Sequence, residues 1–587
     1  MPEGQKLRVV FLVGHDNENT CASIEAVCAT GVIQPTAVVL DVARPGVKGR
    51  LRNLRRNLRR EGPGYILTRM MTAARAFTDQ LSDRAAVNDE EVEALLRKAF
   101  PERNFSLAEL CGRTGFQLHE VPNLNSSEAA AAIAACQADL GIVLGPRILK
   151  SSTFSVPRLG CINLHKGKVP RYRGTPPGFW ALFDGEESAG VTIHFVDSGL
   201  DTGDVIAASE ISIVPRDTPY TLRRKLDWEG ARLLSAVVRS LQDGTAVRTP
   251  QIKGAEKARS KPTAKDVAYL RRKLPHWVVR DDAPLLLKNL YCLAVYYSGL
   301  YGLTRMLHRH STSRAAIVLY HRVNDHCMDA VTVDVRTFAA QITALARRYR
   351  PIGTAELVKH LQKAEPVPPT SVAIHFDDGY RDILTNAAPI LKAAGFSAMA
   401  FINSGYVGTE REFPHDRRSS PFRHENLSWE ELREWAAAGF GVGAHTVNHA
   451  DLGACGLEEA AAEITECGPA LARVLGVPVE MFAYPFGRER HIRPETAAYV
   501  RNAGYAALFS AHGGFVSDGT GLFDIPRLGC NHAAKPLFLL LELEGLAPRQ
   551  VWQRVASVLH RKTPIQPTVP APKAERPGES VVKGVRV

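Results

Sequence analysis

Two groups of side chains in this sequence have the types and spacing that catalysis requires. In the first, Asn163 and His165 close an apolar run, and Asp201 follows further along the chain. Residues two apart in a strand project to the same side, so the amide and the imidazole would share a face. An amide can donate to a developing oxyanion, an imidazole can relay a proton, and a carboxylate can help to deprotonate an attacking amine. This group predicts acyl transfer.

The second group combines carboxylates with imidazoles. Asp377 and Asp378 directly follow an apolar run, and Gly379 then permits a tight turn. His445 and His449 are four residues apart, a spacing that puts both imidazoles on one face of a helical turn. Three protein ligands with an open position suit a divalent metal that lowers the pKa of bound water, and a neighbouring carboxylate can act as general base. This group predicts a metal-dependent hydrolase.

The first half of the chain alternates short apolar runs with segments of helical periodicity. Strands are expected at 8–13, 36–40, 140–144, 161–164 and 191–196, with helices between them, for example at 91–99 and 127–136. This βαβ rhythm predicts a mostly parallel sheet. No G-x-G-x-x-G follows the first strand, so a dinucleotide site is not expected.

A second α/β rhythm occupies the other half. Strands are expected at 315–320, 372–376, 398–402, 441–444 and 481–484, with helices at 337–348, 383–394 and 429–438. Strands and helices that alternate in this way predict a barrel-like α/β domain. The fold class is therefore α/β in both halves.

Around the first group the sequence resembles a known family. The segments I-N-L-H, P-R-Y-R-G and G-V-T-I-H-F-V-D-S-G-L-D-T-G-D, within about residues 7–245, resemble the 10-formyltetrahydrofolate-dependent formyltransferases, which include glycinamide-ribonucleotide, methionyl-tRNA and amino-sugar enzymes. The resemblance implies a Rossmann-like domain with a parallel sheet, 10-formyltetrahydrofolate as formyl donor and a catalytic trio. The implied residues are Asn163, His165 and Asp201 for catalysis, and Leu144, Gly145 and Pro146 near the folate pocket.

One departure from that family concerns the acceptor. Before the proline of P-R-Y-R-G, many members have a small residue and two apolar ones, whereas this chain has Lys166 and Lys168 in the segment 166–169. Two cations beside the acceptor would suit an anionic substrate, such as a sugar nucleotide or a phosphate-linked sugar. The alternative is that both lysines are solvated residues of a loop.

Around the second group the sequence resembles the NodB-type polysaccharide deacetylases. Y-H-R-V from Tyr320, F-D-D-G-Y-R-D, H-T-x-x-H-x-x-L and F-A-Y-P-F-G carry the resemblance, which covers about residues 313–545. It implies a deformed (β/α) barrel with seven rather than eight units. By the family pattern, Asp377 would be the general base and zinc, or another divalent metal, would be held by Asp378, His445 and His449.

Two features depart from the deacetylase pattern. The arginine often found two residues before the Tyr-Pro pair is absent, and Phe482 and Ala483 stand there. The late catalytic-acid histidine has no clear position. His532 is the candidate, with Arg527 as an orienting group, and a structural role for either residue is the alternative.

These resemblances divide the chain into four segments. We expect a formyltransferase domain at 1–250, a basic linker with a Tyr-rich amphipathic helix at 251–312, a NodB-like domain at 313–545, and a terminal helix with a disordered Pro-rich tail at 546–587. The apolar stretch 290–301 has basic flanks. It fits an interfacial helix on an anionic membrane or a helix packed between the two domains.

Composition narrows the compartment and the partners. The net charge of +12 is concentrated at 48–75 and 253–280, and no aromatic residues interleave in the basic helix at 51–60, which disfavours nucleic acid. The ten cysteines form no C-x-x-C pair, and no secretory leader or apolar run of spanning length is evident. We expect a cytoplasmic protein, with contact to the inner face of the membrane as an open alternative.

Together these expectations describe a bifunctional enzyme of glycan-precursor metabolism. One half would formylate an amino sugar, linked to a nucleotide or a lipid phosphate, and the other would deacetylate or deformylate a carbohydrate. Formylation followed by deformylation, as a protecting-group cycle, competes with exchange of acetyl for formyl. Two further alternatives are a methionyl-tRNA-type formyltransferase fused to an unrelated deacetylase, and one inactive half that serves as a binding module. The tRNA alternative is disfavoured because the expected β-rich tRNA-binding domain is not evident after residue 250.

Overall fold

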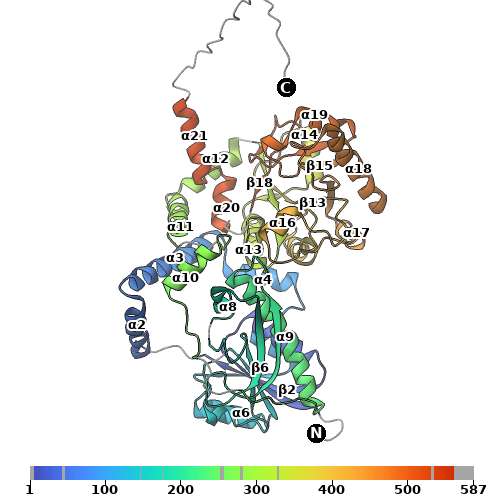
Figure 1. Cartoon of the computed structure of the whole chain (residues 1–587). Coiled ribbons are helices and arrows are strands. Elements are labelled where there is room, and N and C mark those ends of the chain that lie inside the picture. The colour runs from blue at the N-terminus through green and yellow to red at the C-terminus, as the bar shows by residue number, and fades with distance from the viewer. Residues whose placement is uncertain are drawn as a thin grey trace, which may run out of the picture.

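Two α/β domains form the body of the molecule, one at each end of the view in Figure 1. The computed structural model describes residues 6–42, 47–145, 147–174, 176–251, 257–277, 282–311, 313–326, 329–530 and 535–560. Pro146, His532 and the Pro-rich tail expected after residue 563 lie outside these described residues.

The N-terminal domain is built on a seven-stranded sheet. Its strand order is β3-β2-β1-β4-β5-β6-β7, in which β1 to β5 run parallel, β6 is antiparallel to β5, and β7 is antiparallel to β6. The strands are β1 (Leu7–Val13), β2 (Ile33–Asp41), β3 (Gln117–Val121), β4 (Leu140–Leu144), β5 (Cys161–His165), β6 (Ser188–Phe195) and β7 (Val205–Ser212). The expected Rossmann-like domain with a mostly parallel sheet is confirmed.

Strand alternation explains how helices come to cover both faces of this sheet. Phe11 packs in one apolar cluster with residues of helices α1 and α9, whereas its neighbour Leu12 packs in another cluster with residues of α6. Parallel strands buried on both faces read as continuous apolar runs, which is why 8–13 shows no polar alternation. The helices of this domain are α1 (Glu18–Cys28), α5 (Leu107–Thr114), α6 (Ser127–Ala135), α7 (Ser151–Phe154), α8 (Phe179–Asp184) and α9 (Pro219–Gln242).

The C-terminal domain is a sheet that curls into an incomplete barrel. Its strands follow the order β16-β15-β14-β13-β12-β8, and β17, β18 and β11 pair at the β8 and β12 side. Ile525 closes the curl because it hydrogen-bonds to both Leu508 and Ser510, just before β18 pairs with β8. The strands are β8 (Arg314–Tyr320), β11 (Arg350–Pro351), β12 (Ser371–Phe376), β13 (Met399–Ile402), β14 (Gly441–Ala444), β15 (Met481–Ala483), β16 (Ala507–Phe509), β17 (Val516–Ser517) and β18 (Leu528–Gly529).

Helices surround this barrel, as the deacetylase resemblance implies. Side chains of β8 alternate between an inner cluster that contains Ile317 and an outer cluster that contains Val318 and helical residues. A small pair, β9 (Arg322–Val323) and β10 (Thr332–Val333), lies beside it. The helices are α13 (Val335–Ala346), α14 (Thr354–Gln362), η1 (Ile383–Ala387), α15 (Ala388–Ala394), α16 (Pro414–Ser419), α17 (Trp429–Ala437), α18 (Leu457–Leu475), η2 (Glu489–His491), α19 (Pro494–Asn502), α20 (Pro536–Leu543) and α21 (Pro548–His560).

Helices from the first half of the sequence join the C-terminal domain. Between β2 and β3 the chain forms α2 (Val47–Glu61), α3 (Gly64–Ala86) and α4 (Asp89–Ala99), and buried residues of α3 and α4 belong to the core cluster of the barrel helices. Lys535 Nζ lies 3.0 Å from Asp83 Oδ2 across this junction. The polypeptide ranges expected for the two domains therefore interpenetrate in space.

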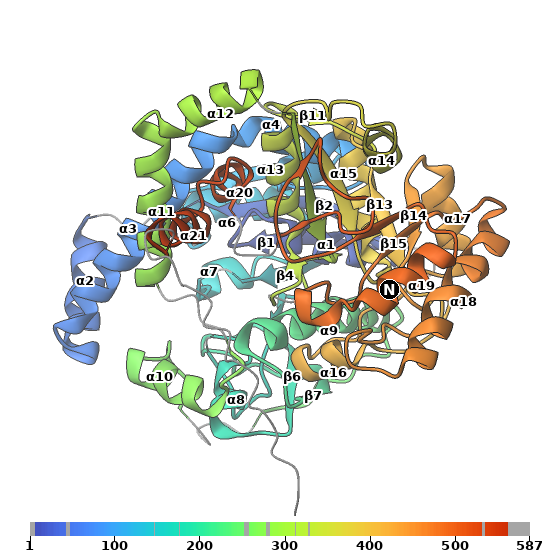
Figure 2. The ribbon, with the colours of Figure 1, turned by 90° about the horizontal axis from the view of Figure 1, so that it is seen from above.

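The connector is helical; its first helix contacts α8 of the transferase domain, and its second helix packs on this junction. It forms α10 (Ala264–Lys273), α11 (Asp282–Tyr297) and α12 (Leu300–Ser311), and α11 lies beside α3 in both views (Figures 1 and 2). Cys292 and Leu293 are buried there, whereas Leu290 and Tyr297 are exposed. Within the described residues, no helix has the length and apolarity needed to cross a membrane.

Candidate active sites

The first site forms where β5 ends and the loop between β6 and β7 returns. Asn163 and His165 both belong to β5, and Asp201 reaches them from that loop, where its backbone has a φ of 54°. Asn163 Nδ2 lies 3.4 Å from Asp201 Oδ1, and His165 Nδ1 lies 3.4 Å from Asp201 Oδ2. The structure thus brings together the three residues that the sequence singles out.

A fourth residue, His194, completes this group and was not predicted. In the antiparallel register it is the direct partner of Asn163, and its Nε2 lies 3.2 Å from Asn163 Nδ2 and 3.6 Å from Asp201 Oδ1. The backbone N–H of Gly174 also donates to Asp201 Oδ2, at 3.1 Å. Histidine at a buried strand position was the available signal, but only the antiparallel pairing of β5 with β6 shows where it points.

Burial and hydrogen bonding set the charges in this site. Burial raises the pKa of Asp201, but the neighbouring imidazoles of His194 and His165 and the hydrogen bond from Gly174 outweigh it, so the pKa lies below its usual value. Burial lowers the pKa of His165, against the opposing charge of Asp201. His165 Nε2 lies 2.7 Å from the carbonyl of Tyr172, which can only accept, so Nε2 carries the hydrogen and the bare Nδ1 faces Asp201.

A pocket of about 560 Å³ opens over these residues. Leu144 and Gly145, which the resemblance places near the folate, line it at the end of β4 together with His15 and Asn17; Pro146 lies outside the described residues. The pocket is open enough to admit a ligand to Asn163 and Asp201.

The two lysines that suggested an anionic acceptor are already neutralised. Lys166 forms an ion pair with Asp227, and Lys168 Nζ lies 3.3 Å from Glu210 and 3.7 Å from Glu186. Neither interpretation offered by the sequence, free acceptor-binding cations or solvated loop residues, describes them, because each is held by carboxylates of the same domain.

The second site lies at the ends of β12 and β14. Asp378, His445 and His449 each offer a ligand atom here, and these three atoms lie within 4.8 Å of one another. Asp378 Oδ1 lies 3.2 Å from His449 Nε2 and 3.7 Å from His445 Nε2. The predicted group is therefore assembled, and its donor set of one carboxylate and two imidazoles suits a divalent metal such as zinc.

The expected helical turn under the two histidines is wrong. β14 ends at Ala444, and His445 and His449 follow it in irregular chain, where Thr446 and His449 have φ values of 67° and 58°. Their rings approach to 5.3 Å because the loop folds back, not because a helix aligns them. Asp378 has a φ of 75°, so left-handed backbone is concentrated at the cluster, as is common where function fixes the geometry.

The Asp378 carboxylate is buried, and neither oxygen accepts a hydrogen bond from the described residues. A buried carboxylate that accepts no hydrogen bond is costly, and a bound cation would relieve that cost. His445 Nδ1 donates to the carbonyl of Ala483 at 2.7 Å, which orients Nε2 toward Asp378 as in many metal sites. The residues present therefore fit a divalent metal.

Asp377 is oriented by Arg527 beside this cluster. The guanidinium donates from Nη1 to Oδ1 at 2.6 Å and from Nη2 to Oδ2 at 2.9 Å, and both side chains are buried. Asp377 Oδ2 remains 3.9 Å from His445 Nε2, within reach of a ligand held by the cluster. His532, the residue expected to act as the late acid, lies outside the described residues.

Another histidine near the cluster was missed. His415, from α16, has its Nε2 3.8 Å from Asp378 Oδ2 and 3.0 Å from the hydroxyl of Tyr380. No motif or spacing marks it in the sequence, because α16 lies in a long connection between β13 and α17 and only the fold brings it to β12.

Family models match both halves of the chain. The formyl transferase model matches residues 86–238 and the polysaccharide deacetylase model matches residues 364–508. The chain is a fusion of a formyl transferase domain and a polysaccharide deacetylase domain. The first match contains Asn163, His165 and Asp201, and the second contains Asp377, Asp378, His445 and His449.

Curated relatives match the formyl transferase domain. The methionyl-tRNA formyltransferase of Agathobacter rectalis is 44% identical over 115 residues, which are 19% of this chain and 37% of that protein. That of Nitrosospira multiformis is 36% identical over 143 residues, 24% of this chain and 46% of that protein. The chain thus spans less than half the length of these relatives.

Solved structures are similar to each half. A Streptococcus pyogenes deacetylase in complex with acetate is 22% identical, with a TM-score of 0.34, and the alignment covers 40% of this chain and 99% of that one. A glycinamide ribonucleotide transformylase from Symbiobacterium toebii is 20% identical, with a TM-score of 0.29, and the alignment covers 43% of this chain and 95% of that one.

Proposed function

We propose that the fusion carries out two reactions on one amino sugar: folate-dependent N-formylation and metal-dependent N-deacylation, in the synthesis of a glycan precursor. The observation that carries this proposal is that one chain holds both assembled groups, Asn163–His165–Asp201 and Asp378–His445–His449. Hydrolysis of an N-acyl sugar leaves a primary amine, and a primary amine is what formyl transfer consumes.

In the transferase domain, bound 10-formyltetrahydrofolate would supply the formyl group. Asn163 Nδ2 can donate to the formyl oxygen as it gains negative charge when the sugar amine attacks. The attacking nitrogen must lose a proton, and the bare Nδ1 of His165 beside ionised Asp201 can take it. The same proton can pass on to the departing nitrogen of the donor.

In the deacetylase domain, Asp378, His445 and His449 would hold the metal. The metal would supply Lewis acidity and an activated water for attack on the acyl carbon. Asp377, fixed by the Arg527 fork, can take the proton of that water as general base. Because the guanidinium of Arg527 donates one hydrogen bond to each oxygen of Asp377, the carboxylate keeps one orientation toward the cluster.

The acyl group removed can be identified with a variant whose transferase is silenced. Zinc-loaded Asp201→Ala protein would be incubated with N-acetyl and N-formyl forms of candidate amino sugars, and the released acid would be measured. Acetate release supports exchange of acetyl for formyl. Release of formate but never acetate would instead support a cycle in which formylation is later reversed.

The curated relatives favour methionyl-tRNA as a second candidate acceptor. Against it, the described residues that follow α9, at 257–277 and 282–311, form the helices α10, α11 and α12 and no β-rich module. Formylation of charged initiator tRNA at a rate comparable with that of amino sugars would overturn the sugar assignment, and an inactive half would show in the absence of either product.

A peripheral membrane contact is also proposed, on the side of the molecule that carries α2, α3, α11, α12 and α21 (Figures 1 and 2). More than half of the exposed large apolar side chains among the described residues lie on these helices, including Met70, Leu303 and Trp552. The exposed arginines of α2 are Arg52, Arg55, Arg56, Arg59 and Arg60. Apolar side chains beside a dense positive charge suit an anionic bilayer.

Vesicle flotation tests this contact. The full-length protein is expected to float with vesicles that contain phosphatidylglycerol and not with phosphatidylcholine alone. Arg55→Glu/Arg56→Glu should abolish flotation, whereas Val247→Ala, at an exposed position outside these helices, should not. Equal binding to both vesicles, or self-association of the protein through this face without lipid, would contradict the proposal.

A further inference from the structure

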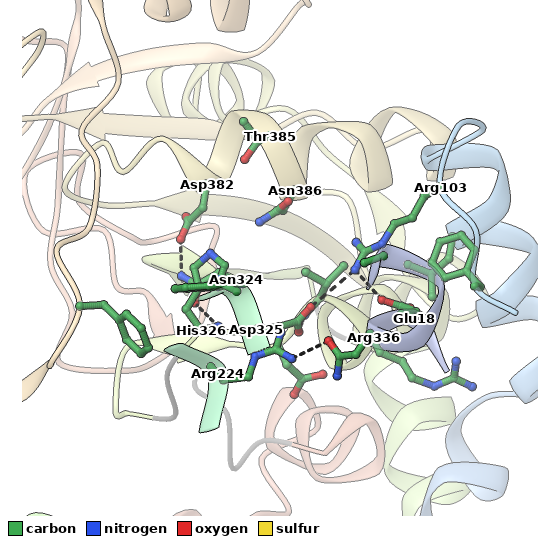
Figure 3. Close-up of a pocket in the computed structure, with 18 of the residues that line it drawn as sticks. Glu18, Arg103, Arg224, Asn324, Asp325, His326, Arg336, Asp382, Thr385 and Asn386 are labelled. Carbon is green, nitrogen blue, oxygen red and sulfur yellow. Dashed lines mark hydrogen bonds and ion pairs between the residues drawn. The ribbon is translucent and has the colours of Figure 1, made fainter. Parts of the chain in front are cut away.

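A cavity of about 1090 Å³ lies between the two domains. Its walls come from α1 and α9 of the transferase domain and from residues 324–326, η1 and residues 422–425 of the deacetylase domain. Figure 3 shows Arg224, Arg103 and Glu18 of the first facing Asn324, Asp325 and His326 of the second. Asn17, Asn19, Ala22 and Trp228 line both this interdomain cavity and the transferase pocket. The two spaces therefore adjoin.

Most cations that line the interdomain cavity are paired with carboxylates. Arg103 Nη2 lies 2.5 Å from Glu18, and Arg381 Nη1 lies 2.7 Å from Glu425. Arg224 is different: among the described residues it has no carboxylate partner, and its Nη1 donates to Asn19 Oδ1, at 2.9 Å. Its Nε is buried and makes no hydrogen bond there. A buried donor on a permanent cation is costly to leave unmet, and an anion would satisfy it.

The neighbouring arginine extends this positive charge into the transferase pocket. Arg223 lines that pocket, is exposed, and also has no carboxylate partner among the residues described. By contrast, Arg147 and Lys166 in the same pocket are held by Asp41 and Asp227. The two consecutive arginines of α9 therefore place unneutralised charge at the boundary between the two spaces.

An aromatic residue stands beside these arginines. Trp228 follows Arg224 by one helical turn, so both lie on the same face of α9. Its ring centroid lies 4.8 Å from that of His326 and 5.5 Å from that of Phe422, both in edge-on contacts with the deacetylase domain. Trp228 nevertheless remains 46% exposed. The deacetylase domain thus fixes an aromatic surface that is free to contact a ligand.

We propose that the interdomain cavity binds the phosphate-bearing end of the transferase's acceptor, so that the deacetylase domain completes the acceptor site. The inference rests on the proposed amino-sugar function and specifies its substrate as a phosphorylated one. Arg224, with Arg223 beside it, binds the phosphate by charge-assisted hydrogen bonds. Trp228 packs on the ring attached to that phosphate, and the amine lies in the adjoining pocket next to Asp201.

Calorimetric titration of the full-length protein, with tetrahydrofolate bound, tests this assignment. The probes are glucosamine, glucosamine 1-phosphate and inorganic pyrophosphate. Arg224→Gln is expected to weaken binding of both phosphorylated probes by about tenfold or more, the usual effect of losing a hydrogen bond to a charged group. Phe422→Ala, in the other domain, should weaken the binding of glucosamine 1-phosphate by about threefold to tenfold, because the ring of Trp228 loses its contact with Phe422.

Arg239→Gln is the matched control, since Arg239 is an exposed arginine of the same helix outside both spaces. Its affinities should equal those of the unsubstituted protein. Unchanged tetrahydrofolate affinity shows that each variant is folded. Equal affinity for glucosamine and glucosamine 1-phosphate, or equal losses in Arg224→Gln and Arg239→Gln, would overturn the proposal.

Separate formylation assays keep the two proposals distinguishable. Pyrophosphate binding that depends on Arg224, with no amino sugar formylated, would contradict the proposed function and leave the phosphate subsite standing. Formylation of an unphosphorylated amino sugar at the same kcat/KM as its phosphate, unaffected by Phe422→Ala, would support the function and refute the subsite.

Discussion

At the residue scale, the carboxylates of the two sites differ in the hydrogen bonds that they accept. Asp201 accepts hydrogen bonds from the Gly174 amide and from Asn163 Nδ2, so its negative charge is satisfied by protein donors. Asp378 is as buried as a core residue but receives no hydrogen bond from the described residues. The first arrangement suits a carboxylate that works on a proton, and the second suits one that binds a cation.

Asp378→Asn is expected to remove the metal. The substitution keeps the volume but takes away the negative ligand, so metal bound after dialysis should fall from about one per chain to a small fraction, with metal affinity reduced at least about tenfold. Elemental analysis of the purified protein measures this. Asp451→Asn, at a partly exposed carboxylate of the same domain, should keep its metal; metal retained in Asp378→Asn would contradict the ligand assignment.

The pH dependence of formyl transfer should report His165. Its pKa lies below the ordinary value of 6.5, so the imidazole stays neutral at higher pH and gains a proton only as the pH falls below that value. Protonation fills Nδ1, so kcat/KM should be flat from pH 8 to about 6.5, apart from titration of the acceptor, and then fall. His165→Asn should lower kcat by about 10²–10⁴-fold.

The unsubstituted protein and His165→Asn would be assayed with the same acceptor, whose amine titrates identically in both assays. The ratio of their kcat/KM values at each pH therefore reports the titration of His165 alone. The groups that face the imidazole are Asp201 and His194. An acid limb above pH 6.5 that disappears in His165→Asn would contradict the lowered pKa of His165. A ratio that does not vary with pH would show that the neutral imidazole is not required.

At the element scale, regular segments were predictable and irregular ones were not. Five strands of each sheet and helices such as α6 and α17 follow from periodicity, because each buries an apolar face of defined spacing. The strands β3, β7 and β16 and the short strands β11, β17 and β18 were not predicted. The histidine pair after β14 was wrongly placed on a helix, because i and i+4 spacing also fits a loop with left-handed residues. The position of His194 depends on antiparallel pairing of β5 and β6, which the local sequence does not encode.

The spatial boundary between the two domains could not be predicted from the local sequence either. Apolar spacing predicts α4 as a helix, but not that its buried face packs on the barrel helices α13 and α15 instead of on the sheet that surrounds it in the sequence. A partner separated by more than two hundred residues leaves no local signal. Site residues close to one strand end could therefore be predicted, whereas His415 and Arg224 required the fold.

Val92→Ala should destabilise the deacetylase domain, although residue 92 lies in the transferase half of the sequence. Val92 is 1% exposed within the barrel-helix cluster, and losing two buried carbons with partial collapse costs about 1.5–3 kcal/mol. The urea midpoint for zinc release should fall accordingly. Val247→Ala, where the side chain is 71% exposed, should change it by less than about 0.5 kcal/mol.

In the same urea titration, the loss of tetrahydrofolate binding reports unfolding of the transferase domain, for comparison with zinc release. A Val92→Ala protein that loses tetrahydrofolate at lower urea but releases zinc at the unsubstituted midpoint would show that α4 supports only the transferase domain.

At the scale of the whole molecule, the two domains share more than a linker. α3, α4 and α11 pack on the barrel helices, and Trp228 of the transferase domain meets His326 and Phe422 of the deacetylase domain. The positive charge also differs between surfaces. Most cations of the transferase pocket are paired with carboxylates, whereas α2 exposes a row of arginines to the outside. This arrangement favours one substrate, worked on in turn, over two unrelated activities.

The most direct test of that claim is a single-vessel reaction. Zinc-loaded protein would be incubated with an N-acetylated sugar phosphate and 10-formyltetrahydrofolate labelled with ¹³C in the formyl group, and the sugars would be followed by mass spectrometry. We expect the N-acetyl sugar to become the ¹³C-formyl sugar with acetate released, while Asp201→Ala stops at the free amine and Asp378→Asn leaves the substrate unchanged. An unlabelled sugar pool in the unsubstituted enzyme, or label found only on tRNA, would contradict the account.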